Sequence, residues 1–556
     1  MISDVQDRRG YGCWSCQSRS PSNAPTREVA VTSTPNSSAD NDWASVFVAS
    51  AVVAVVMLDT MGVSQSLPTI GTDLDASDTQ IRWILNGTTL ASAIALIPAG
   101  RAGDRWGRRK VGVIGLLMFG LGSIIGAVAQ TIGILIVARL IVGFGMAALV
   151  ATSLAIVTAS VDSNSQPKAI ARWTAITATG AAIGPLAAGW FTEALSWRWF
   201  LGTEALLALA LAALLQHLAA ESKDPTAPRS LDLAGTAALA IGLGATIYGL
   251  MVIPDHGVTA VRVVPALVVG ALGLLVLLMI ERREDAPLLD LGLFLRRRYL
   301  AVAVVALVAN WAYAVMIFYV PLYLQTILDF GPTAAGALFL LFTVPYGALS
   351  LVVDRVESRV VPALLTAVGL GVLVVGLVVA GLITPTQGLF AVTLSLLITA
   401  VGQTLVFNVS GSQAMEMGGT SSGTASGALS TIRQLGFLLG LAVTGTIVQV
   451  SQSRHLNSEL SARGIDLSIS ERSALLSDLS GTSSDSTSIS ASSESVLSKA
   501  FGSSAKASEL SDQLFVDALR VGYWSVAGLC AVAILAAITS RAPRGTLDSN
   551  DSVNSG

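Results

Sequence analysis

Three ionisable residues lie inside long apolar stretches in the first half of the chain: Asp59, Arg139 and Glu204. Each stretch is long enough to cross a bilayer core about 30 Å thick. At about 1.5 Å per residue, counted from the same side of the membrane, all three lie roughly 8–11 Å deep. A charged side chain facing lipid near the midplane costs about 2.5–3.5 kcal/mol. We therefore expect all three to turn inward.

Arg139 can neutralise only one of the two carboxylates. We predict that Asp59 either pairs with Arg139 or takes a coupling proton, and that Glu204 is a second titrating acid. Burial and a neighbouring guanidinium act on a carboxyl group in opposite directions, so the two acids need not titrate together. The alternative is that Arg139 and Glu204 reach the headgroups at the membrane surface and have no role in proton binding.

A second arginine, Arg433, lies near the middle of a later apolar stretch. At that depth it must meet an acid, a carbonyl group or water, which favours a role in lining or gating a cavity. Other polar and aromatic residues in the second half are candidates for an amphipathic pocket or for simple contacts between helices: Asn310, Tyr313, Tyr319, Gln325, Tyr346, Gln403 and Asn408.

The composition indicates a polytopic membrane protein. The chain has 556 residues, of which 53% are hydrophobic and only 12% charged, whereas soluble domains carry about 25% charge. Its net charge of −3 says little, because the distribution of charge matters more. Fourteen apolar stretches are predicted to span the membrane, near residues 44–66, 82–100, 111–130, 133–159, 169–192, 199–219, 231–253, 262–280, 299–323, 335–353, 361–383, 388–410, 423–449 and 521–540.

Charge in the loops predicts the orientation. The loop from Arg101 to Lys110 is the densest group of charges in the first 280 residues, and later basic loops alternate with short or acidic ones. Lys and Arg concentrate in cytoplasmic loops. We therefore expect a multi-pass protein of the cytoplasmic membrane, with both termini inside.

The spans divide the chain into five parts. We predict a disordered cytoplasmic tail (1–42), a six-helix bundle (43–220), an inserted helix pair with linkers (221–298), a second six-helix bundle (299–540) and a cytoplasmic tail (541–556). The second bundle includes a long Ser-rich outer loop (450–519). Asp354 and Arg355, followed by Arg359, weakly repeat the spacing of Asp104, Arg105 and Arg109, which supports two related halves.

Two motifs resemble those of the major facilitator superfamily. The basic loop is similar to the family's G-x-L-A-D-R-x-G-R-R run, and the matching residues are Gly100, Asp104, Arg105, Gly107, Arg108 and Arg109. In the family this loop is a latch that stabilises one state of the transport cycle. In the fifth span, Gly180, Gly184, Pro185 and Gly189 resemble the antiporter signature G-x-x-x-G-P-x-x-G-G, which occurs in exporters.

Shorter runs around the buried charges resemble the same family. The sequence around Arg139 is similar to R-x-x-x-G-x-G-x-A, that around Arg433 to R-Q-L-G, and that around Asp59 to L-D-x-T-x-V-N-V-A-L-P. The last run departs at Met61 and at residues 64–66, and Glu204 stands where the family often has Asn. Fourteen spans favour the branch of fourteen-span drug:proton antiporters.

The resemblance implies an all-α major facilitator fold and export of hydrophobic or amphipathic compounds, driven by inward proton flow. Buried acids suit cationic or neutral cargo, although Arg433 leaves anionic cargo open. Alternatives are a dedicated exporter of an endogenous lipid, siderophore or antibiotic, and a non-transporting receptor or scaffold. No phosphate-binding loop or metal-ligand cluster occurs in the sequence. We expect no enzyme activity, no cofactor beyond the proton gradient and no nucleic-acid partner; protein partners stay open.

Overall fold

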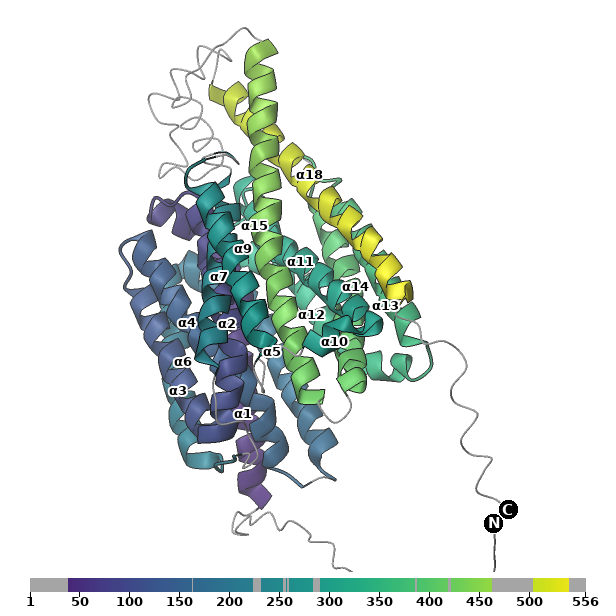
Figure 1. Ribbon diagram of the computed structural model, residues 1–556. Coiled ribbons are helices and arrows are strands. Elements are labelled where there is room, and N and C mark those ends of the chain that lie inside the picture. Colours follow the sequence, from purple (N-terminus) through teal and green to yellow (C-terminus); the bar gives the residue numbers. More distant parts are fainter. Residues whose placement is uncertain are drawn as a thin grey trace, which may run out of the picture. The chain divides into compact units, whose positions relative to one another are not determined.

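The computed structural model describes residues 39–539, except 163, 224–231, 254–256, 258–259, 284–290, 386–387, 419–421 and 463–503. Within these ranges the chain is helical (Figure 1), as predicted. The long helices are α1 (Ala39–Asp73), α2 (Asp78–Trp106), α3 (Arg108–Ala127), α4 (Ile132–Ala159), α5 (Gln166–Ala194), α6 (Trp197–Leu218), α7 (Leu233–Met251), α9 (Val263–Glu281), α11 (Arg297–Thr326), α12 (Pro332–Glu357), α13 (Pro362–Ala380), α14 (Leu389–Gly418), α15 (Ser422–Ala462) and α18 (Ser504–Thr539). A short helix, α10 (Leu291–Leu295), precedes α11.

Thirteen of the helices in the described part of the chain are long and apolar enough to cross a membrane. The exception among the long helices is α5, which covers the predicted span 169–192 and has 29 residues. Its Gly, Thr and Trp residues lower its mean hydropathy. It nevertheless packs along α1 and α12, so its place in the bundle matches that of a span.

The helices form two halves. In the N-terminal half (α1–α6), α1 packs on α5, α3 on α4 and α6, and α2 on α4. In the C-terminal half (α11–α18), α13 packs on α14 and α18, and α11 on α15. The inserted helices α7 and α9 pack on each other, and α7 contacts both α2 and α15 (Figure 1).

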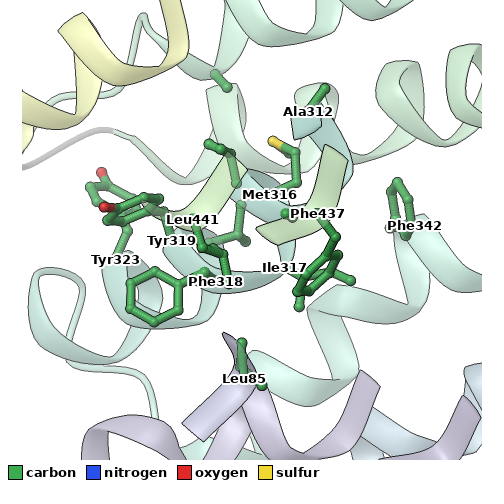
Figure 2. Packing of buried hydrophobic residues seen from close by; sticks show 14 of the residues in the cluster. Leu85, Ala312, Met316, Ile317, Phe318, Tyr319, Tyr323, Phe342, Phe437 and Leu441 are labelled. Carbon is green, nitrogen blue, oxygen red and sulfur yellow. The ribbon is translucent and has the colours of Figure 1, made fainter. Parts of the chain in front are cut away.

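Successive long helices run in alternating directions. We call the end that holds the turn between α2 and α3 the basic end, and the other the opposite end. The largest buried apolar cluster draws on both halves. Figure 2 shows Met316, Phe437 and Leu441 of the C-terminal half gathered together, with Leu85 of α2 facing them from the N-terminal half.

Helix ends differ from the sequence expectation in two places. Helix α15 continues to Ala462 and α18 begins at Ser504, so both ends of the predicted loop 450–519 are helical. Leu456 is fully buried there, which explains why a Ser-rich segment stays helical. Helix α1 begins at Ala39, inside the predicted tail 1–42. The rest of that tail, residues 463–503 and the tail 541–556 lie outside the described residues.

Candidate functional site: a buried charge cluster between two gated ends

The three ionisable residues of the N-terminal half meet in its interior. Both terminal nitrogens of Arg139 donate to Asp59, at 2.6 Å to Oδ1 and 2.7 Å to Oδ2. Asp59 is 0% exposed, Arg139 2% and Glu204 0%. A bidentate pair of this kind is among the strongest polar contacts in proteins. The pair fixes the relative rotation of α1 and α4, and all three side chains are buried within the bundle.

Glu204 lies beside this pair, within hydrogen-bonding range of Asp59. Neither of its carboxylate oxygens receives a hydrogen bond from an N–H group or a hydroxyl in the part of the chain that the structure describes. It is close enough to interact electrostatically with both Asp59 and Arg139. The cluster therefore holds two acids and one cation, so one carboxylate charge has no counterion unless a proton neutralises it.

Helix α1 separates the charge cluster from the C-terminal half. Asp59 faces α4 and α6, whereas Met61, two residues later, accepts a hydrogen bond from the Tyr313 hydroxyl of α11 at 3.0 Å. Two residues turn a helix by about 200°. The two faces of α1 thus contact different halves of the protein.

The residues of the antiporter signature hold α1 and α12 against α5. A Cβ built on Gly184 would lie 2.6 Å from the Leu58 carbonyl oxygen, and one on Gly180 would overlap the Ala54 carbonyl. A Cβ on Gly189 would overlap the Pro332 carbonyl of α12. Pro185 lies inside α5. A Cβ built on Gly336 of α12 would overlap the Pro185 carbonyl oxygen, so only glycine fits at that position. These small residues therefore bring one helix close to both halves.

The basic-end turn is anchored within the N-terminal half. Gly107 has a φ of 120°, a conformation that glycine adopts without strain. Arg108 pairs with Asp104 at 2.9 Å. The backbone N–H of Arg109 donates to Glu221 Oε1 at 3.0 Å, and its guanidinium donates to the Ala219 carbonyl at 3.1 Å. Glu221, which follows α6, carries no motif in the sequence and was not among the predicted residues.

The two other residues of the predicted latch lie at its edge. Gly100 faces Ala151 of α4 without crowding. A Cβ built on Gly100 would lie 3.8 Å from the Ala151 Cβ, an ordinary van der Waals distance. Arg105 is exposed. The latch role of the six matching residues stays a prediction.

At the opposite end a second polar group joins the halves. We call Asp78 and Arg82 of α2 and Gln449 of α15 the clamp. Arg82 is 3% exposed and donates to Gln449 Oε1 at 2.7 Å, while Gln449 donates to Asp78 at 3.2 Å. Tyr319 of α11 lies within electrostatic range of both charges. The clamp was not predicted from the sequence, because Arg82 is the first residue of a predicted span and resembles an interfacial anchor.

Another contact between the halves involves Glu193, one residue beyond the predicted span 169–192. Its Oε2 accepts a hydrogen bond at 3.0 Å from the backbone N–H of Thr333, in the first turn of α12. Gln325 of α11 also donates to the Gln65 carbonyl of α1, at 2.9 Å. These contacts and the clamp hold the opposite ends of the two halves together.

Acid is expected to weaken the Glu193 contact. Hydrogen bonding from the side chain and backbone of Thr333 lowers the pKa of Glu193 below its ordinary value of 4.5. The bond therefore contributes fully above pH 4.5 and is lost as the pH falls through the lowered pKa. Spin labels at the exposed positions Gln130 and Thr326 should move apart in that acid range. Glu193→Gln should remove this change, and an identical acid response in that variant would contradict the prediction.

Arg433 lies in the C-terminal half, at the end of a row of aromatic rings. Its guanidinium lies 3.7 Å from the centre of the Phe407 ring and donates to Ser410 Oγ at 3.0 Å. Its Nε is buried without a partner. Arg433 and the acids of the N-terminal half thus belong to separate groups, and the proton-coupling or substrate role of each stays a prediction.

Comparison with known proteins agrees with this architecture. The chain is 36% identical over 300 residues to the puromycin resistance protein pur8 of Streptomyces alboniger, covering 54% of this chain and 59% of that protein. It is 28% identical over 416 residues to the multidrug resistance protein Stp of Mycobacterium tuberculosis, covering 73% and 76%. The fold is similar to a bacterial homolog of the human lysosomal transporter Spinster, with a TM-score of 0.62, 13% identity and coverage of 92% and 100%.

The family model described as Major Facilitator Superfamily matches residues 49–441, which include the latch, the antiporter signature and all four buried charges. This confirms the resemblance found in the sequence. The chain therefore belongs to the Major Facilitator Superfamily.

Proposed function

We propose that this transporter exports hydrophobic or amphipathic compounds in exchange for protons, with the basic end and both termini in the cytoplasm. The observation that carries the proposal is the buried cluster of Asp59, Arg139 and Glu204, which has one acid more than cations. A bundle that contains such a cluster binds a proton where water cannot compensate the charge.

Glu204 is the acid that takes the proton in this scheme. Asp59 already accepts two hydrogen bonds from Arg139, whereas Glu204 has no cation of its own in the described structure and lies within hydrogen-bonding range of Asp59, a contact between two acids that requires a proton. A proton on Glu204 removes the uncompensated charge. When the proton leaves, the added negative charge competes with Asp59 for Arg139 and weakens the bond between α1 and α4.

Helix α1 transmits this change to the C-terminal half of the protein, where the cargo is released in this scheme. It carries Asp59 on one face and Met61, which contacts Tyr313 of α11, on another. A rotation or tilt of α1 therefore alters the contact between the halves. Proton binding in one half is in this way coupled to cargo release in the other, as alternating access requires.

The test uses purified protein in liposomes with an imposed pH gradient and a panel of fluorescent amphipathic compounds. Wild-type protein should accumulate or expel a compound only while the gradient lasts, and a protonophore should stop it. Glu204→Gln imitates the protonated acid permanently. It should lose gradient-driven transport at least tenfold while retaining passive exchange of the compound.

Glu509→Gln is the matched control, because Glu509 is exposed and the substitution changes the same chemical group. It should transport like wild type. Unchanged proton dependence in both Glu204→Gln and Asp59→Asn would contradict the proposal. A wild-type protein that moves no compound under any gradient would favour the receptor or scaffold alternative.

A second candidate is a dedicated exporter of one compound. It is favoured by the altered first-span run and by a relative named cephamycin export protein CmcT, from Amycolatopsis lactamdurans. The same liposome panel separates the two functions. A multidrug exporter should move several unrelated compounds, whereas a dedicated exporter should move one chemical class.

A further inference from the structure

Four aromatic rings form a continuous row through the C-terminal half. The ring centres of Tyr313 and Phe342 are 5.8 Å apart, those of Phe342 and Tyr346 6.0 Å, and those of Tyr346 and Phe407 6.3 Å. We call these four residues the aromatic wall. The rings of Phe342 and Tyr346 are stacked within 12° of parallel. The wall begins at the contact of Tyr313 with Met61, where the two halves meet, and ends at Arg433, over Phe407.

A polar group faces the space beside this wall. Tyr313, Phe342 and Gln403 surround a space together with Ala312, Met316, Leu373 and Thr399, and this space is closed in the present state and must widen to admit a molecule. Gln403 is only 2% exposed, and its Oε1 has no hydrogen-bond partner in the described part of the chain. An unpaired buried amide oxygen costs about 1–3 kcal/mol. A bound molecule that offers a hydroxyl or amino group would satisfy it.

The charge beside the wall is positive. No carboxylate in the described ranges forms an ion pair with Arg433, whose guanidinium donates instead to the Phe407 carbonyl at 2.5 Å and to Ser410 Oγ at 3.0 Å. The acids that were expected to favour cationic cargo lie elsewhere. Asp59 and Glu204 are both 0% exposed and lie inside the N-terminal half, where Asp59 is on the face of α1 away from Met61. A cargo against the aromatic wall therefore meets a guanidinium and no free carboxylate.

We propose that the aromatic wall and Arg433 bind planar aromatic cargo that carries an anionic or strongly hydrogen-bond-accepting group. The rings hold the flat face of the cargo, Arg433 holds its acceptor or anion, and Gln403 binds a second polar substituent. Stacking on rings gives affinity without demanding a single shape, and the guanidinium sets the charge preference. This inference rests on the proposed export function, since it names the class of compound exported.

The experiment measures binding to the full-length protein in detergent, without any gradient. The probes are two fluorescent molecules with the same flat ring system and opposite charge, 1-pyrenesulfonate and 1-pyrenemethylammonium. Wild-type protein should bind the sulfonate about tenfold more tightly, which corresponds to one charge-assisted contact. Arg433→Gln should abolish this preference, and Arg433→Lys should retain part of it. Phe342→Leu should weaken binding of both probes about equally.

Phe390→Leu is the matched control for the loss of a ring, because Phe390 is on α14 but 75% exposed. It should bind both probes like wild type. Equal or tighter binding of the ammonium probe by wild type would overturn the proposal, even if Arg433→Gln fails to fold. An unchanged preference in folded Arg433→Gln would overturn it as well. Loss of gradient-driven transport with the charge preference intact would instead contradict the proposed antiport alone.

Discussion

Arg139→Gln is expected to lower the stability of the protein by about 3–5 kcal/mol and to abolish gradient-driven transport. The substitution leaves Asp59 and Glu204 buried close together without a counterion, and breaking a buried ion pair by removing one partner has this effect. Thermal unfolding of the detergent-solubilised protein measures the first effect. Transport in liposomes, at equal amounts of correctly folded protein, measures the second.

A double variant separates structure from function. Asp59→Asn combined with Arg139→Gln replaces the bidentate ion pair, with its 2.6 and 2.7 Å bonds, by neutral amides of similar size. Neutral replacement of a buried pair is often nearly neutral for stability. The double variant should therefore unfold close to the wild-type temperature while still failing to couple transport to protons. An Arg139→Gln protein as stable as wild type would refute the paired geometry.

Arg82→Met is expected to shift the protein toward a state in which the opposite ends of the two halves separate. The clamp joins α2 and α15 through the Arg82–Gln449 hydrogen bond of 2.7 Å. A buried hydrogen bond to a charged group contributes about 1.5–3 kcal/mol. Its loss should change the ratio of the two states by about 10–100-fold.

Spin labels at Gln130 and Thr326 measure this ratio, in a background without Cys13, Cys16 and Cys530. The long-distance population should grow in Arg82→Met and also in Gln449→Leu. The double variant should show little further change, since both substitutions break the same contact. A distance distribution identical to that of wild type in both single variants would contradict a closing role for the clamp.

The constant rise of an α-helix made it possible to predict that the three buried charges lie at the same depth. Because a helix advances 1.5 Å per residue whatever its sequence, counting from the span ends placed Asp59, Arg139 and Glu204 in one layer. The rotation of each helix about its axis does not follow from such counting. Whether Asp59 pairs with Arg139 therefore stayed open in the sequence, and the bidentate contact in the structure shows that it does.

Contacts between the halves were less predictable. Arg82 and Gln449 are 367 residues apart, and Glu193 and Thr333 are 140 apart. Nothing in the local pattern of either partner identifies the other, because the register between two bundles depends on how many side chains pack together. Glu221 was missed for a related reason, since an acid just beyond a helix end looks like an ordinary solvated loop residue.

The inserted helices give the two sides of the bundle different access to lipid. Helix α7 packs against both α2 and α15 where these two helices meet. Thr446 of α15 donates to the Leu250 carbonyl of α7, and Asn86 of α2 donates to the Met251 sulfur of α7. A hydrophobic molecule dissolved in the bilayer therefore meets α7 before it can pass between α2 and α15. Where α5 meets α12, by contrast, the two helices close the line themselves, since a Cβ on Gly347 would lie only 3.2 Å from the Ala178 side chain.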